Sequence, residues 1–198
     1  MSSARGPSGS GGHRDRGRGT GRGRSRTGQH LDIGHLFQGH ALNAVDAKGR
    51  VSVPAGFRSL IEKRALKNAL DPDNTLMIGE HASGNCLTAL DSVASAEFDQ
   101  QLRDGVADLP AAQRLTALED ARVDAFGSLE SVKFDSAGRM VLSPMLRAVG
   151  EIEDLAFFLG AGSSFQIWNP VKALAAFPDG SRNRKTLAFL LKERGIPA

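Results

Sequence analysis

Two short stretches of the chain set a carboxylate, a glycine and an arginine at the same spacing. They are Asp46-Ala47-Lys48-Gly49-Arg50 and Asp135-Ser136-Ala137-Gly138-Arg139. An aspartate side chain accepts amide hydrogen bonds from residues just after it, and glycine adopts the positive φ that many tight turns need. Such a turn does not require arginine, whose guanidinium binds phosphate oxygens and guanine edges. The residues therefore offer the chemistry of a basic turn that binds anions or nucleic acid.

The two stretches belong to a longer repeat. Asp135 follows Asp46 by 89 residues (135 − 46), and this offset aligns residues 45–58 with 134–147 without a gap. Apolar residues coincide at 45/134, 51/140, 53/142 and 57/146. Shared polar residues interleaved with a shared apolar alternation are typical of a duplicated supersecondary unit. We predict one strand–turn–strand unit that is used twice.

A simpler interpretation of each motif is a tight turn with an exposed ion pair. Arg50 is placed either to pair with Asp46 across the turn or to point into solvent, and an exposed pair contributes little to stability. Turn geometry explains Asp46 and Gly49, and in the second copy Asp135 and Gly138, so we predict these four as structural turn residues. It does not explain why the arginine occurs twice.

The apolar pattern predicts the elements that position the turns. Period-two alternation and turn residues predict strands, and near-helical apolar spacing predicts helices. The resulting order is strand, turn and strand over 35–57, a helix at 59–66, a hairpin of 76–78 with 86–90, helices at 93–103 and 110–127, strands at 131–134 and 140–142, a short helix after 144, strands at 155–159 and 165–168, a helix from 169 and a surface helix at 182–194. The pattern as a whole predicts a mixed α+β fold.

The net charge of +3 is unevenly distributed. Residues 1–30 hold seven arginines against one aspartate, a net charge of +6, so residues 31–198 carry −3. Residues 1–35 are rich in arginine and glycine and poor in apolar residues, which predicts a disordered tail. Such a tail either binds polyanions without sequence preference or is only a solubility tail. Nucleic-acid binding by the rest of the chain must use a local basic patch.

Several other classes of protein have no support in the sequence. It has no apolar run near the roughly 20 residues that span a bilayer, and its N-terminal stretch lacks the apolar segment of a secretory signal. With Cys86 as the single cysteine, we expect a cytoplasmic protein with no internal disulfide and no membrane partner. His30, His35 and His40 recur every five residues, a spacing that predicts no metal site. No nucleophile, zinc or phosphate-loop motif occurs, so we expect no cofactor and no enzymatic activity.

The repeated motifs resemble the MraZ family of bacterial transcriptional regulators. The similarity covers about residues 36–177. It rests on both Asp-x-x-Gly-Arg motifs, the first followed by Pro54 and Arg58 and the second by Pro144 and Arg147. It also rests on two aromatic motifs, Phe37-Gln38-Gly39-His40 and Phe165-Gln166-Ile167-Trp168. The resemblance implies two intertwined AbrB-like β-hairpin repeats that form a small β-barrel with peripheral helices. It also implies a ring-shaped homo-oligomer.

The resemblance and the element order together predict five segments. These are a disordered Arg/Gly-rich tail (1–35), a first AbrB-like repeat (36–91), a helical connection (92–130), a second AbrB-like repeat (131–170) and a C-terminal helical segment (171–198). Because the family's chain normally starts near the Phe-x-Gly motif, we also hypothesise that residues 1–35 precede the true start of the protein.

The function implied by the resemblance is sequence-specific binding of double-stranded DNA. The family binds short direct repeats in the promoter of the division and cell-wall gene cluster, usually as a repressor, which implies a cytoplasmic, nucleoid-associated protein. Its DNA-contacting arginine maps onto Arg50, its neighbouring basic residue onto Lys48, and the matching residue of the second copy is Arg139. Because Ala137 replaces the basic residue of the second turn, we predict that Lys48 and Arg50 dominate and that Arg139 is secondary or structural.

Two alternative functions stay open. An AbrB-like antitoxin would share the fold, but we would expect it to have a single copy of the repeat and a toxin-binding tail. An RNA-associated protein acting through its Arg/Gly tail would keep its binding in residues 1–35 alone and lose it when they are removed.

Overall fold

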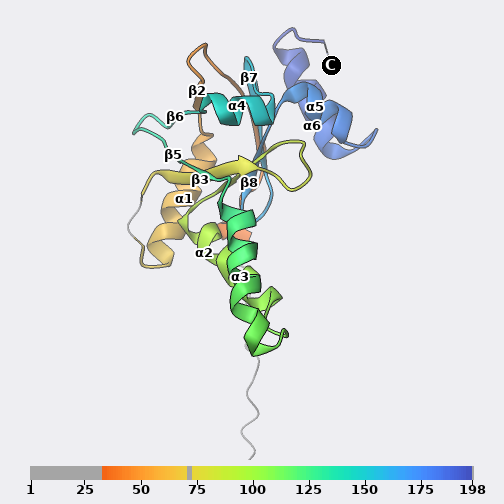
Figure 1. The fold of residues 1–198 in the computed structure, drawn as a ribbon. Helices are drawn as coiled ribbons and strands as arrows, with labels where there is room; N and C mark the ends of the chain where they lie inside the picture. Colours follow the sequence, from red (N-terminus) through yellow and green to blue (C-terminus); the bar gives the residue numbers. More distant parts are fainter. Residues whose placement is uncertain (1–32, 71–72, 198) are drawn as a thin grey trace, which may run out of the picture. The chain divides into compact units, whose positions relative to one another are not determined.

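The computed structural model describes residues 33–70 and 73–197 of the 198-residue chain (Figure 1). The predicted tail therefore lies outside the described residues, apart from Ile33–His35, which form a short 3₁₀ helix, η1. The described part contains eight strands and six α-helices. It is a mixed α+β structure, as predicted.

The elements follow one another in two similar runs. The first run is β1 (His40–Ala44), β2 (Arg50–Ser52), α1 (Ala55–Lys67), β3 (Thr75–Glu80), β4 (Leu87–Leu90) and α2 (Ser92–Gly105). After α3 (Ala111–Phe126), the second run is β5 (Glu130–Lys133), β6 (Arg139–Val141), α4 (Pro144–Gly150), β7 (Leu155–Gly160), β8 (Phe165–Trp168) and α5 (Pro170–Ala176). The helix α6 (Arg182–Glu193) follows. The order strand, strand, helix, strand, strand, helix thus occurs twice.

A six-stranded antiparallel sheet combines strands of both runs in the order β1-β7-β8-β4-β3-β5. β1 of the first run pairs with β7 of the second, with His40 opposite Leu159. β5 of the second run pairs with β3 of the first, with Thr75 opposite Lys133. The hairpins β3-β4 and β7-β8 meet at the β4–β8 pair. Each run therefore gives its first strand to the hairpin of the other run.

The strands β2 and β6 form a separate two-stranded antiparallel ribbon in which Val51 lies opposite Met140. The sequence predicted a hairpin around the first turn, but β1 and β2 do not pair as a ladder: the isolated bridge of Val45 with Val51 and a hydrogen bond from the Asn43 side chain to the Ser52 carbonyl connect them. They separate because strands of the other run supply their hydrogen-bonding partners. In the described part of the chain β1 and β5 are the two edges of the sheet, and a closed barrel with AbrB-like hairpins remains a prediction.

One apolar core joins the two runs. Val51 and Met140 point into it from the ribbon, while the residues on either side of them are exposed, as strand alternation requires. Phe37, from the Phe-Gln-Gly-His motif, is buried with its ring centre 5.5 Å from Phe57 and 5.1 Å from Phe165. These contacts bring residues from the start of the first run and the end of the second into one cluster.

Helix starts are set by prolines and side-chain caps. α1 begins at Ala55, directly after its N-cap residue Pro54 (φ −54°, ψ 136°), which is four residues earlier than the predicted start at residue 59. Asp91 caps α2 by accepting from the N–H of Ala94 at 2.7 Å, and Asn169 caps α5. No helix in the described residues has both the length and the apolar character needed to cross a membrane.

Candidate nucleic-acid interface

The first turn is held by the side chain of Asp46. Its Oδ1 accepts hydrogen bonds from the backbone N–H groups of Lys48 and Arg50, each at 2.9 Å. The backbone N–H of Gly49 donates to the carbonyl oxygen of Asp46 at 2.8 Å. Gly49 has a φ of 77°, a backbone conformation that is strained for any residue that has a Cβ. Asp46 and Gly49 thus fix the path of the backbone and leave the side chain of Lys48 exposed.

The second turn repeats this geometry. Oδ1 of Asp135 accepts from the backbone N–H of Arg139 at 2.9 Å, and the N–H of Gly138 donates to the carbonyl of Asp135 at 2.7 Å. Gly138 has a φ of 81°. The position that Lys48 holds in the first turn is occupied here by Ala137, so the two turns share a shape and differ in charge.

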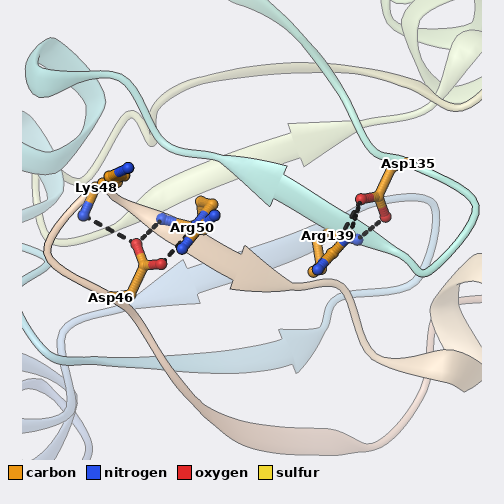
Figure 2. A network of polar contacts seen from close by, with 5 residues as sticks. All are labelled: Asp46, Lys48, Arg50, Asp135 and Arg139. Carbon is orange, nitrogen blue, oxygen red and sulfur yellow. Dashed lines mark hydrogen bonds and ion pairs between the residues drawn. The ribbon is translucent and has the colours of Figure 1, made fainter.

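Each repeated arginine pairs with the aspartate of its own turn (Figure 2). Nε of Arg50 donates to Oδ2 of Asp46 at 2.5 Å, and Nε of Arg139 donates to Oδ2 of Asp135 at 3.0 Å. The arginine side chains nevertheless stay 53% and 60% exposed. A guanidinium has five N–H donors, so a bond through Nε orients the side chain and leaves donors for another acceptor. The ion pair and an outward-facing cation are therefore compatible.

The electrostatics of the turns favour ionised aspartates. The pKa of Asp46 is lowered first by the hydrogen bond from the backbone N–H of Arg50 and then by the bond from its side chain. The pKa of Asp135 is lowered by the same two contacts from Arg139. The carboxylates therefore remain charged at neutral pH and hold both guanidinium groups in place.

The ribbon places the two turns at its opposite ends. Figure 2 shows one group of side chains at each end: Asp46, Lys48 and Arg50 at the first, Asp135 and Arg139 at the second. Because Val51 and Met140 are buried at the middle of the ribbon, the flanking residues of both strands lie on its opposite, outer face. All three predicted DNA-binding residues are thus exposed on one structural unit, built from both runs.

Two further arginines of the repeat, Arg58 and Arg147, have a role that sequence reasoning did not assign. A Cβ placed on Gly138 would run into the guanidinium of Arg58, and a Cβ on Gly49 would lie 3.2 Å from Cδ of Arg147. Nε of Arg147 also donates to the carbonyl of Ile152 at 3.2 Å. Each arginine therefore supports the turn of the other run. Their repetition was visible in the sequence, but the exchange of the two runs was not.

The fold and the site define a class of protein. It is a mixed α+β chain in which a strand–strand–helix run occurs twice, and the first strand of each run pairs with the hairpin of the other. Two Asp–Arg turns lie at the ends of one ribbon built from both runs. No family model matches the chain. The curated protein "Transcriptional regulator MraZ" of Ruegeria pomeroyi is 35% identical over 140 residues, which cover 68% of this chain and 77% of that protein. The protein of the same name from Gluconobacter oxydans is 31% identical over 172 residues, covering 82% and 93%. The chain belongs to the MraZ family of transcriptional regulators.

Proposed function

We propose that the chain is a transcriptional regulator that binds double-stranded DNA sequence-specifically through Lys48, Arg50 and Arg139. The observation that carries the proposal is the ribbon β2–β6, on which both arginines are oriented by a carboxylate and remain more than half exposed. A two-stranded ribbon fits the major groove of DNA, where arginine bound to guanine is the commonest specific contact. The mildly acidic charge of residues 31–198 makes such a local patch necessary.

The first turn is the main DNA contact in this proposal. Arg50 and Arg139 are held in the same way, because each donates its backbone N–H and its Nε to the aspartate of its own turn. The two turns differ in charge, because Lys48 is exposed at the first turn and the equivalent residue of the second turn is Ala137. One more cation favours the approach of the phosphate backbone to the first turn, and Arg139 becomes the secondary contact.

The finer parts of the proposal follow from the family. We place the protein at the nucleoid in the cytoplasm, as a ring-shaped homo-oligomer that represses the division and cell-wall gene cluster through short direct repeats in its promoter. An operator made of direct repeats can be bound by several subunits of an oligomer, with one ribbon at each repeat. In this arrangement the AbrB-like repeats are 36–91 and 131–170, connected by the helical segment 92–130 and flanked by residues 1–35 and 171–198.

A footprint on the DNA upstream of the protein's own gene, followed by gel-shift titration, tests the proposal. Arg50→Ala should weaken binding by about 1–3 kcal/mol, as expected for a base-reading arginine. Arg139→Ala should lose less, and Arg182→Ala, an exposed arginine on α6, should bind like the wild type. Equal losses for Arg50→Ala and Arg139→Ala reject the dominance of the first turn. The absence of a footprint, or binding that no ribbon arginine affects, rejects the function.

The same titration addresses binding through the tail. Deleting residues 1–32 leaves η1 intact and removes a net charge of +5, from seven arginines against Asp15 and Asp32. The ribbon proposal predicts that the footprint remains in the same place while binding becomes weaker and less salt-dependent. Loss of all binding, with binding retained by the tail peptide alone, would favour the RNA-associated alternative.

A further inference from the structure

The outer face of the ribbon carries four exposed side chains in a two-by-two arrangement. Arg50 and Ser52 come from β2, and Arg139 and Val141 come from β6. The register sets Arg50 opposite Val141 and Arg139 opposite Ser52. The two arginines therefore lie on one diagonal of the face, and the valine and serine lie on the other.

These two cross-strand pairs are the closely spaced pairs of the ribbon. The backbone N–H of Leu142 donates to the carbonyl of Gly49 at 2.9 Å, and that of Val53 donates to the carbonyl of Gly138 at 2.8 Å. Because hydrogen-bonded and non-hydrogen-bonded pairs alternate along an antiparallel ribbon, the outward-facing pairs between these bonds are non-hydrogen-bonded, and their side chains stand nearest to each other. A ligand group that contacts the Cβ end of one arginine side chain is thus within reach of the residue opposite that arginine.

The face would be symmetric but for one difference. Ser52 and Val141 occupy the same position in the two copies of the repeat, and Val141 is 52% exposed. An exposed valine contributes little to the core. On this ribbon the opposite face, with Val51 and Met140, contacts the core. A single solvent-exposed valine is ordinary on a protein surface, but this one stands beside the arginine that the proposed function puts on DNA.

We propose that Val141 and Ser52 are specificity-determining residues that make the ribbon read its site in one direction. The inference rests on the proposed function. Val141 contacts the C5-methyl group of a thymine next to the position read by Arg50, since thymine is the base that presents a methyl group in the major groove. The hydroxyl of Ser52 beside Arg139 donates and accepts, so it has no preference for a methyl group. One end of the ribbon then reads a methyl group and the other does not.

The test uses duplexes of the footprinted upstream DNA in which each thymine is replaced in turn by deoxyuridine, which lacks the methyl group. Wild-type protein should lose about fourfold in affinity at one thymine of each bound site, the value of one buried methyl group. Val141→Ser should lose this sensitivity. Ser52→Val should gain a second sensitive thymine across the centre of the site, because it places a valine opposite Arg139.

Both substitutions are at exposed positions, and Ser52 accepts its hydrogen bond from Asn43 through the backbone carbonyl, which the substitution retains. Circular dichroism and the melting temperature should therefore match the wild type. If Arg50→Ala weakens binding but no deoxyuridine substitution does, or if Val141→Ser keeps the wild-type pattern, this inference is overturned and the proposed function stands. If binding depends on neither Arg50 nor Arg139, the inference and the proposed function both fail.

Discussion

The guanidinium of Arg58 occupies the space where a Cβ of Gly138 would stand. The equivalent pair in the other direction is Arg147 and Gly49. Each arginine comes from the helix that follows one strand of the ribbon, and each glycine comes from the turn that precedes the other strand. The two runs therefore hold each other's turns in shape, and the geometry of the basic residues depends on both runs together.

Alanine at the two turn glycines should destabilise the fold to different extents. Both glycines have a positive φ, 77° at Gly49 and 81° at Gly138, which costs alanine about 1–2 kcal/mol at either position. At Gly49 the new Cβ would also lie 2.5 Å from the backbone oxygen of Leu142, whereas at Gly138 it meets the flexible end of Arg58. Gly49→Ala should therefore lower the free energy of unfolding more than Gly138→Ala, measured by urea denaturation followed through Trp168 fluorescence.

A third glycine provides the control for this comparison. Gly56 lies in α1, and its missing Cβ would have no atom within 4 Å. Gly56→Ala should be neutral or should stabilise the protein by up to about 1 kcal/mol, because alanine is the better helix former. Equal losses for the two turn variants, or a larger loss for Gly138→Ala, would contradict the importance of the contact with Leu142.

The local structure of this protein could be predicted from its sequence because local residues determine it. The 89-residue repeat correctly indicated the two turns, since the aspartate and the glycine supply the hydrogen bonds and the positive φ. The helices predicted at 93–103, 110–127 and 182–194 are confirmed as α2, α3 and α6. The strands predicted at 155–159 and 165–168 are confirmed too, as β7 and β8, which pair as an antiparallel hairpin.

The strand partners could not be predicted in the same way. Apolar alternation identifies the buried face of a strand but not the strand that receives its hydrogen bonds. The pattern around Asp46 therefore suggested a local hairpin, while β1 pairs with β7 and β2 pairs with β6. The role of Arg58 was hidden for the same reason, because its contact with Gly138 joins residues 80 positions apart (138 − 58).

A buried ion pair ties the start of the described chain to α1 and α2. The side chains of Arg64 and Asp91 are 4% and 1% exposed, and Nε of Arg64 lies 2.9 Å from Oδ2 of Asp91. Arg64 also donates to the carbonyl of His35 at 3.0 Å and lies over the ring of Phe37. Asp91 accepts in addition from the N–H of Ala94. The pair is thus the centre of a small polar network within the apolar interior.

Removing both charges of this pair should cost less stability than the two single removals added together. Asp91→Asn removes the buried counter-charge of the Arg64 guanidinium and leaves only the exposed carboxylate of Glu97, 3.7 Å away, so its cost should approach the roughly 3–5 kcal/mol of breaking a buried ion pair. In the double variant Arg64→Met/Asp91→Asn no uncompensated charge remains, so its loss of stability should be smaller than the sum of the two single losses. Urea denaturation of the four proteins gives the coupling energy. Additive losses would show that the two charges do not support each other.

The link between α2 and α3 should weaken in acid. Asp99 of α2 accepts from Nε and a terminal nitrogen of Arg122 at 2.7 and 2.9 Å, and from Nε of Arg103 at 2.8 Å. These contacts, with Arg122 the largest cause, lower the pKa of Asp99 from 3.8 to about 2. Since the folded pKa is the lower one, the stability that the carboxylate contributes is present above pH 3.8 and is lost as the pH falls through about 2.

Carboxyl-carbon NMR titration of Asp99 measures this shift directly. The midpoint should be near pH 2 in the wild type, and Arg122→Met should raise it more than Arg103→Met does. The acid-induced loss of stability should then be smaller in Arg122→Met than in the wild type. A wild-type midpoint at the ordinary value for aspartate, or a larger rise in Arg103→Met, would contradict the order of the two contacts.

Lys48 and Ala137 occupy the same position in the two turns, so exchanging the charge there tests which turn faces DNA. A lysine that contacts a phosphate adds about one to the slope of log K against log salt concentration and gives no base preference. Lys48→Ala should therefore reduce that slope by about one and weaken binding to all sequences alike. Fluorescence-anisotropy titrations at several salt concentrations, with the footprinted duplex and a scrambled one, measure both effects.

The reciprocal variant Ala137→Lys gives the second turn the charge that it lacks. If the first turn dominates, the added lysine stands farther from the phosphates, and the slope should rise by less than Lys48→Ala lowers it. Lys185→Ala, which removes an exposed lysine on α6, should leave the slope unchanged and so serves as the control. A full gain of about one in Ala137→Lys would place both turns equally on DNA, and an unchanged slope in Lys48→Ala would remove Lys48 from the interface.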